Sequence, residues 1–311
     1  MSKWRSTVAD YAGMLIALVI IVAGFSGRAP HFLSAATFRT IANEIPEAIF
    51  IATGMTFVLI IGGIDLSVGS VAGLAGAILG FGLATLHLSP LMAIPLGIAA
   101  GVGCGFVNGF ITAQWRLPSF IVTLGMLEMA RGGAYLVTDS RTMYVGGPIE
   151  RIADLSLLGV SLPFILAIAT IAGAQFLLAR TVFGRSVVAI GSNEEAARFS
   201  GIDSRPLKIK VFVLSGLLAA VSAVVGVSRM ASADPNAGTG AELQAIAAVV
   251  IGGTSLMGGR GTVIGSFFGV VIIALLENGL AQVGAQEPVK RLITGAVIVL
   301  AVLVDRFRAG P

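Results

Sequence analysis

The sequence has few charged residues for its length. Only 12% of the 311 residues are charged, about half of the roughly 25% found in globular proteins. A soluble domain of this size needs far more charge to cover its surface. The composition therefore excludes a soluble enzyme and a disordered chain, and a single cysteine excludes a secreted disulfide scaffold.

Side chains that carry catalytic or metal-binding chemistry are equally scarce. The only histidines are His31 and His87, which argues against a histidine metal site and a histidine proton relay. The lone Cys104 cannot form an internal disulfide. No glycine is followed by lysine, so the sequence contains no phosphate-binding P-loop. We expect no catalytic residue, no metal site and no cofactor.

Apolar residues and glycine are abundant. Apolar types make up 56% of the chain, 41 residues are glycine, and the mean hydropathy is +0.96. These values are typical of a polytopic membrane protein, in which glycine lets neighbouring helices approach closely. The net charge of +4 fits lysine and arginine in loops beside a lipid bilayer. We expect no nucleic-acid partner.

Charge-free stretches indicate where the chain crosses the bilayer, because about 20 apolar residues span the hydrocarbon. They predict an all-α polytopic membrane protein with about ten transmembrane helices. The first is expected to be an uncleaved helix rather than a signal peptide, because no small-residue cleavage site precedes Arg28. The second should begin near Thr40 and contain Pro46. The stretches are residues 11–27, 48–64, two within 66–115 separated by a turn at 86–90, 118–137, 155–179, 211–228, 243–259, 261–279 and 292–304.

Loop charge predicts the orientation of these helices. Ten spans place both termini on one side of the membrane, and the loops on that side carry twelve lysines and arginines against six on the other. Positive loop charge favours the cytoplasm, so we expect both termini to be cytoplasmic. Merging the short eighth and ninth spans would break this assignment. The chain is then a single transmembrane domain, residues 1–311, with its longest cytoplasmic loop at 180–210.

That loop contains a predicted short helix within residues 190–203. Ser192 is placed to cap its start, and Glu195 three residues later completes a capping box. Gly201 suits the helix end, where a left-handed residue is needed. Ala196, Ala197 and Phe199 give the helix a partly apolar surface. Such a helix could dock on a cytoplasmic partner or lie on the membrane as a connector, and this pattern leaves both interpretations open.

Two glycine-rich segments share the sequence Ile-Gly-Gly and a later Gly-Ser, with the isoleucine of the first, Ile61, just before the segment. They are residues 62–70 and 251–266, and the match is suggestive of an internal repeat. Short, glycine-interrupted apolar segments often mark the central site of a transporter, but both could also be turns at helix ends. Asp65 in the first segment is expected at a helix start, where the helix dipole favours a carboxylate.

These three segments together resemble the permease subunit of a ribose-type ABC sugar importer, in the branched-chain and ribose permease family. The segments that carry the resemblance are 62–70, 189–202 and 248–269. It implies a second permease copy, cytoplasmic ABC ATPase subunits, a periplasmic sugar-binding protein and a bacterial inner membrane. It also implies that the cytoplasmic helix couples to the ATPase. The coupling residues would be Gly191, Ser192, Asn193, Glu194, Glu195, Ala196, Ala197 and Gly201.

Polar residues within or beside the spans are candidates for lining a translocation path. Glu128 and Arg131 are three residues apart on one helix face, so an internal ion pair is the more conservative interpretation of Glu128. Asp65, Glu128 and Glu277 would also be the only available relay for an ion-driven transporter. The path candidates are Asn43, Asp65, Ser67, Asn108, Glu128 and Asn278.

The resulting hypothesis is a permease that moves a ribose-like monosaccharide inward by alternating access, powered by ATP hydrolysis on separate subunits. One alternative is a permease of the same family for branched-chain amino acids or an autoinducer. Another is a secondary transporter driven by an ion gradient. The missing catalytic groups argue against a membrane enzyme.

Overall fold

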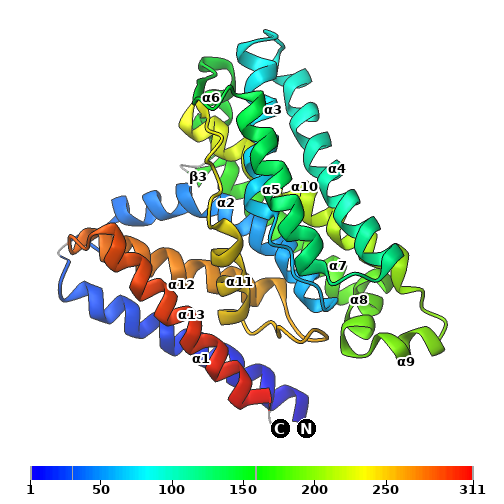
Figure 1. Ribbon diagram of the computed structural model, residues 1–311. Coiled ribbons are helices and arrows are strands. Elements are labelled where there is room, and N and C mark those ends of the chain that lie inside the picture. Colours follow the sequence, from blue (N-terminus) through cyan, green and yellow to red (C-terminus); the bar gives the residue numbers. More distant parts are fainter. Residues whose placement is uncertain (1, 30, 158–159, 310–311) are drawn as a thin grey trace.

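A computed structural model describes residues 2–29, 31–157 and 160–309, with side chains omitted for 2–12, 148, 298 and 301–309. The side chains of Lys3, Arg5, Arg306 and Arg308, which enter the loop-charge comparison, lie outside this description. The described residues form thirteen helices and four two-residue strands (Figure 1). The helices are α1 (Ser2–Ser26), α2 (Ala35–Ile60), α3 (Val68–Ala84), α4 (Pro90–Trp115), α5 (Ser119–Val137), α6 (Gly147–Asp154), α7 (Leu162–Arg180), α8 (Val182–Ser192), α9 (Glu194–Phe199), α10 (Ser204–Met230), α11 (Ala241–Ile251), α12 (Val263–Gln282) and α13 (Glu287–Ala309).

The strands form two small antiparallel pairs. One joins β1 (Met143–Tyr144) to β4 (Ser232–Ala233), with Met143 opposite Ala233. The other joins β2 (Ser156–Leu157) to β3 (Val160–Ser161). These pairs involve the segments that flank α6, so they organise a connection between helices rather than a sheet.

Each of the ten predicted spans overlaps one helix, namely α1 to α5, α7 and α10 to α13. Six of these helices are long and apolar enough to cross a membrane: α2, α4, α5, α7, α10 and α12. Helices α3 and α11 have 17 and 11 residues and are shorter than a full span. The prediction of a multi-helix membrane protein is therefore confirmed, while the number of crossings stays a prediction.

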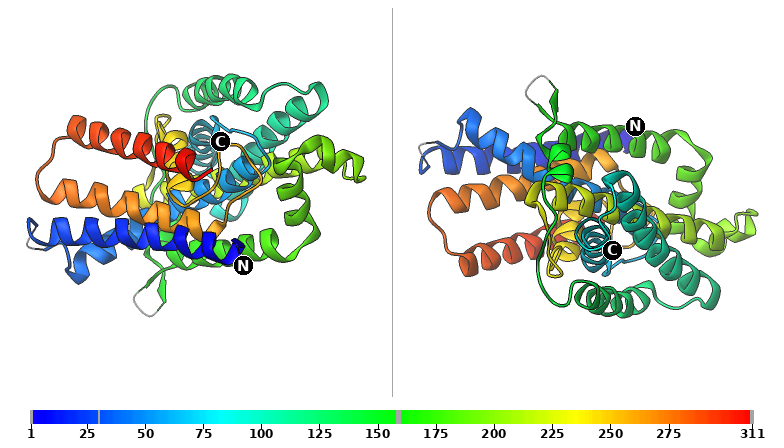
Figure 2. Two further views of the ribbon diagram at one scale, coloured as in Figure 1. Left: turned by 90° about the horizontal axis from the view of Figure 1, so that it is seen from below. Right: turned by 90° about the horizontal axis from the view of Figure 1, so that it is seen from above.

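Helices α2 and α10 provide much of the packed core. Met55, Phe57 and Leu59 of α2 are fully buried. Helix α10 packs closely against α4, because glycines face each other at the contact. A Cβ atom on Gly216 would lie 2.2 Å from the carbonyl oxygen of Gly101. Figure 2 shows α1, α12 and α13 on the side of the molecule opposite α8 and α9.

The segment between α10 and α11 runs back into the helical bundle. A Cβ atom on Gly80 of α3 would lie 2.4 Å from Ala233, and one on Gly69 would lie 2.1 Å from the carbonyl oxygen of Gly238. The segment thus follows α3 from Gly80 to Gly69, a helical rise of about 16 Å. Figure 1 shows it descending to α11. Helix α11 therefore begins inside the bundle, which explains why the eighth predicted span is short.

Candidate functional site

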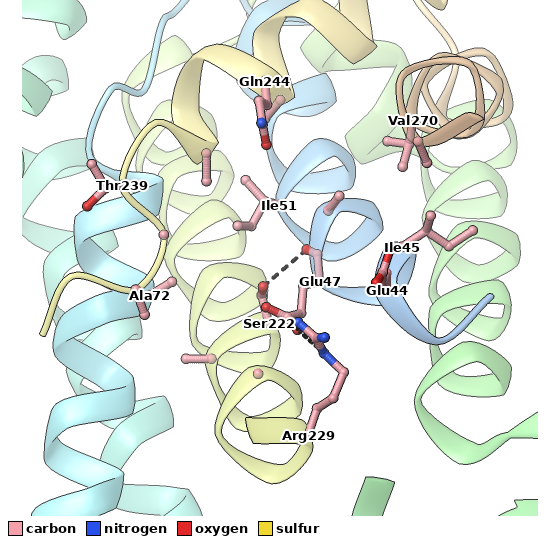
Figure 3. Close-up of a pocket in the computed structure, with 18 of the residues that line it drawn as sticks. Glu44, Ile45, Glu47, Ile51, Ala72, Ser222, Arg229, Thr239, Gln244 and Val270 are labelled. Atoms are coloured by element: carbon pink, nitrogen blue, oxygen red, sulfur yellow. Dashed lines mark hydrogen bonds and ion pairs between the residues drawn. The ribbon is translucent and has the colours of Figure 1, made fainter. Parts of the chain in front are cut away.

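A cavity of about 720 Å³ lies between α2, α3, α10, α11 and α12 (Figure 3). Apolar residues such as Ile51 and Val270 form part of its wall, and none of its lining residues is aromatic or histidine. On α10 the lining residues fall between Ser222 and Met230, near the end of that helix far from α9. The polar lining residues are Glu44, Glu47, Ser222, Arg229, Ser232, Asp234, Thr239, Gln244, Glu277, Asn278 and Lys290.

An ion pair joins α2 to α10 in the wall of this cavity. Arg229 places Nε and Nη2 each 2.9 Å from Oε1 of Glu47. Ser222 donates a hydrogen bond of 3.1 Å to the backbone carbonyl of Glu47. A Cβ atom on Gly226 would lie 2.9 Å from Oε2 of Glu47, so the absent side chain at Gly226 makes room for the carboxylate.

A second group of polar contacts in the cavity wall involves α11 and α12. Gln244 of α11 donates a hydrogen bond of 3.2 Å to Oε1 of Glu277 on α12. Asn278 accepts one of 2.8 Å from Gln282 on the same helix. Figure 3 shows Gln244 at a distance from Glu47 and Arg229, across the cavity. The cavity therefore offers both donors and acceptors to a polar solute.

Arg131 does not pair with Glu128, so the predicted ion pair is wrong. Arg131 instead donates from Nη1 to the carbonyl oxygens of Pro235 and Ala237, the latter at 2.9 Å. Tyr135 donates to the side-chain oxygen of Asn236 at 2.7 Å. The physical reason is that irregular backbone inside a membrane protein needs internal hydrogen-bond partners, and α5 supplies them to the segment that follows β4.

Four buried polar side chains meet outside the cavity, between α3, α4 and α10. Asp65 accepts hydrogen bonds from Ser67 Oγ at 2.6 Å and from Ser215 Oγ at 2.9 Å. Asn108 donates to Ser67 Oγ at 2.9 Å. Asp65 also accepts from the backbone N–H of Ser67 at 3.0 Å, just before α3, so it lies near a helix start as expected. The bond to Ser215 adds a link to α10.

The six predicted path residues occupy different environments. Asn278 lines the cavity. Asp65, Ser67 and Asn108 belong to the buried cluster and do not line it. Asn43 and Glu128 are exposed and also lie outside its lining. These assignments stay predictions.

No local sequence pattern predicts the ion pair of Glu47 and Arg229 or the contact of Gln244 and Glu277. The available signal was a polar residue within an apolar helix, which both Glu47 and Glu277 provide. Their partners lie 182 and 33 residues away along the chain. That separation hides the pairing from any local pattern, since only the packing of the helices brings the partners together.

Helix α9 begins one residue later than predicted. Asn193, not Ser192, is its N-cap, because Asn193 accepts a hydrogen bond of 2.9 Å from the N–H of Ala196. Ser192 is the last residue of α8 and donates to the carbonyl of Val188. The predicted capping box is therefore wrong, because α8 continues through Ser192 and leaves no free helix start there.

The predicted end of α9 is confirmed at Gly201, which has a φ of +82°. Its N–H bonds to the carbonyl of Arg198, and the N–H of Ile202 bonds to the carbonyl of Ala197, both at 3.0 Å. This is the Schellman arrangement, in which a left-handed residue satisfies the last carbonyls of a helix. Ala197 is buried, which anchors one face of α9 to the protein.

A salt bridge joins the first residue of α9 to the beginning of α10. Lys208 Nζ lies 2.7 Å from Oε2 of Glu194, and Ser204 Oγ donates to Oε1 at 2.7 Å. Partial burial raises the pKa of Glu194, but the hydrogen bonds from Lys208 and Ser204 outweigh it and hold the pKa below its usual range. Phe199, 79% exposed, leaves an apolar side chain available on the outer face.

Two of the three segments singled out in the sequence, 189–202 and 248–269, meet at the end of α2, just before the third segment begins. The N–H of Gly259 donates to the carbonyl of Ile60 at 2.8 Å. A Cβ atom on Gly191 would lie 1.7 Å from that same carbonyl and 2.7 Å from the nitrogen of Gly259. We call Ile60, Gly191 and Gly259 the glycine junction. It joins the end of α8 to the end of α2 and to the loop before α12.

A family model for the permease component of the branched-chain amino acid transport system matches residues 37–302. This range contains the cavity, the glycine junction and α9. The chain belongs to this family. Membership identifies it as a permease component and a multi-pass membrane protein, in agreement with its six long apolar helices.

Several curated relatives match nearly the whole chain. The ribose import permease protein RbsC of Escherichia coli (strain K12) is 39% identical over 94% of this chain and 92% of its own length. The L-arabinose ABC transporter permease protein AraH of Azospirillum brasilense is 36% identical over 96% and 88%. The fructose import permease protein FrcC of Rhizobium meliloti is 31% identical over 94% and 82%. No solved structure gave a significant match.

Proposed function

We propose that this chain is the membrane-spanning permease of a bacterial ABC importer and that it moves a monosaccharide into the cell. The observation that carries this proposal is the cavity lined by carboxylates, amides, hydroxyls and Arg229, in a chain similar to three sugar permeases. Hydroxyl groups of a sugar can donate to carboxylates and accept from amides and guanidinium. The lack of aromatic lining residues favours weak binding, which suits passage rather than retention.

The chain crosses the inner membrane about ten times in this proposal, as a single domain of residues 1–311 with both termini in the cytoplasm. The position of α9 supports this orientation, since it lies in the basic loop 180–210. In Figure 1 the start of α1 and the end of α13 lie at the same end of the bundle. The cavity then faces the periplasmic half of the membrane.

Alternating access needs one closed and one open end of the path. The cavity lies toward the far end of α10, while the glycine junction and the cluster around Asp65 pack the end near α9. The proposed state is therefore open to the periplasm and closed to the cytoplasm. A push on α9 would be transmitted by α8 to Gly191, and from there to the backbone of α2 and the loop before α12.

Three partners follow from this function. Cytoplasmic ATPase subunits would dock on α9, where Glu195, Arg198 and Phe199 are exposed. A periplasmic sugar-binding protein would deliver the solute on the cavity side. A second permease copy would complete the membrane unit. ATP hydrolysis would occur on the ATPase subunits, so this chain has no catalytic role of its own.

A branched-chain amino acid is the second candidate solute, since the matching family model carries that description. An autoinducer also remains an alternative within the same machinery. An ion-driven mechanism is disfavoured, because the three relay candidates are dispersed. Asp65 lies in the buried cluster, Glu128 is exposed on α5 and Glu277 lines the cavity.

Uptake into proteoliposomes tests the function. The permease is reconstituted with its ATPase and binding-protein partners, and accumulation of labelled D-ribose, L-arabinose, D-fructose and L-leucine is measured. We expect one monosaccharide to accumulate only when ATP and both partners are present. Accumulation by the permease alone under a proton or sodium gradient would contradict the proposal.

A further inference from the structure

The ion pair of Glu47 and Arg229 is an unusual feature for a wall inside a membrane protein. The two residues come from different helices, and their side chains are 29% and 37% exposed to the cavity region. Charged side chains at membrane depth are costly, so they are rarely retained for packing alone. A partly exposed ion pair is also weak support for stability, since such pairs contribute only about 0–1 kcal/mol.

The pair leaves hydrogen-bonding capacity unused. Both close contacts of Arg229 end on Oε1 of Glu47. Within the described part of the chain, no protein group bonds to Oε2 of Glu47 and none accepts from Nη1 of Arg229. The carboxylate of Glu47 packs against Gly226, where a Cβ atom would approach Oε2 to 2.9 Å. The two paired residues, which both line the cavity, therefore carry one acceptor and one donor without a protein partner (Figure 3).

We propose that this ion pair is the contact at which the cavity recognises the hydroxyl groups of a neutral polyhydroxylated solute. A hydroxyl both donates and accepts, so neighbouring hydroxyls can donate to Glu47 and accept from Arg229 at once. Because the two charges cancel, the pair favours neither anions nor cations. This inference rests on the proposed function and adds the residues that bind the hydroxyl groups of the solute.

A cycle between protein variants and solute analogues tests the assignment. In the reconstituted importer, uptake is measured for whichever labelled monosaccharide the wild type accumulates and for its singly deoxygenated analogues. The variants are Glu47→Gln and Arg229→Gln. If the pair contacts a hydroxyl, the preference for the parent sugar over one analogue falls about fivefold or more in each variant. The binding protein is the same in the wild-type and variant importers. Its own preference among the sugars therefore cancels when the variant is compared with the wild type.

A matched control uses a second ion pair that does not line the cavity. Arg141 and Asp139 lie 3.8 Å apart and are highly exposed, and Asp139→Asn should leave every analogue preference unchanged. If Glu47→Gln slows uptake but leaves the preference for the parent sugar over every analogue unchanged, the inference is overturned. The ion pair would then be only a structural contact between α2 and α10. Absence of ATP-dependent uptake of any monosaccharide by the wild type would instead overturn the proposed function, and this inference with it.

Discussion

At the scale of single residues, Gly191 has no room for a side chain. The nearest atom to a Cβ would be the carbonyl oxygen of Ile60, at 1.7 Å, and this clash involves backbone that cannot rotate away. Gly191 is therefore a point where α8 touches the core directly. The resemblance of residues 189–202 to a coupling segment predicted a role for Gly191, but its contact with Ile60 and Gly259 depends on the folded chain.

Substituting Gly191 tests whether the glycine junction transmits motion. Gly191→Ala must push α8 away from α2, and we expect a loss of about 1–3 kcal/mol in unfolding free energy with a large loss of ATP-driven uptake. The measurements are thermal unfolding and uptake in proteoliposomes. Gly173→Ala in α7 is the matched control, because no atom lies within 4 Å of a Cβ there. Normal uptake by Gly191→Ala would contradict a mechanical role.

Three of the path candidates, Asp65, Ser67 and Asn108, meet in one buried cluster outside the cavity. Asp65 was predicted at a helix start, and it is there, but it also accepts a bond from Ser215 of α10. Ser67 and Asn108 were path candidates, and they contact each other within the same buried cluster. A sequence pattern identifies a costly polar residue inside a membrane protein. It does not reveal whether that residue faces a cavity or another helix.

At the scale of elements, the segment from β4 to α11 is the least regular part of the cavity wall. Its backbone departs from helix between Ser232 and Ala241, and Arg131 on α5 donates to two of its carbonyl oxygens. Irregular backbone at membrane depth is tolerated where it is held by protein and lines a cavity. Helix α5 therefore supports the cavity without lining it.

Removing that support should loosen the segment. Arg131→Met removes this donor from the carbonyls of Pro235, which is buried, and Ala237, which is exposed. An unsatisfied buried group costs about 1–3 kcal/mol, and a group that water can reach costs less. We expect lower thermal stability and several-fold weaker uptake. Gly132→Ala on the same helix is the control and should behave as wild type, because no atom lies within 4 Å of a Cβ there. Equal effects of the two substitutions would contradict the support role.

At the scale of the whole molecule, orientation in the membrane follows from which loops are cytoplasmic. The loop that contains Ser140 follows α5, and the loop that contains Ser200 follows α9. Both serines are exposed, so single cysteines at these positions can report on each side. The native Cys104 is replaced first to give a cysteine-free background.

With both termini cytoplasmic, Ser140→Cys should react with a membrane-impermeant maleimide in intact cells with a permeabilised outer membrane. Ser200→Cys should react only after the inner membrane is opened. The measurement is labelling of the purified chain on a gel, in Cys104→Ser. The reverse pattern would place the termini outside and would remove α9 from the reach of an ATPase.

The sequence by itself determined the class of protein and the regions of helix. Low charge, high hydropathy and the spacing of charge-free stretches identify membrane helices, because the bilayer acts on each segment separately. The same local reasoning located Gly201 at the end of α9, since a left-handed residue is needed there. The same reasoning did not predict α8, because the charged residues around it indicate a loop. It also placed the N-cap of α9 at Ser192, where the structure has Asn193.

Only the tertiary structure decided which residues meet. The contacts of Glu47 with Arg229, of Arg131 with Pro235 and of Asp65 with Ser215 each join residues at least 104 positions apart along the chain. They depend on how far each helix is rotated and shifted against its neighbours. That packing is set by many close glycine contacts acting together. No short window of sequence contains this information, so the cavity and its ion pair emerge only when the helices are assembled.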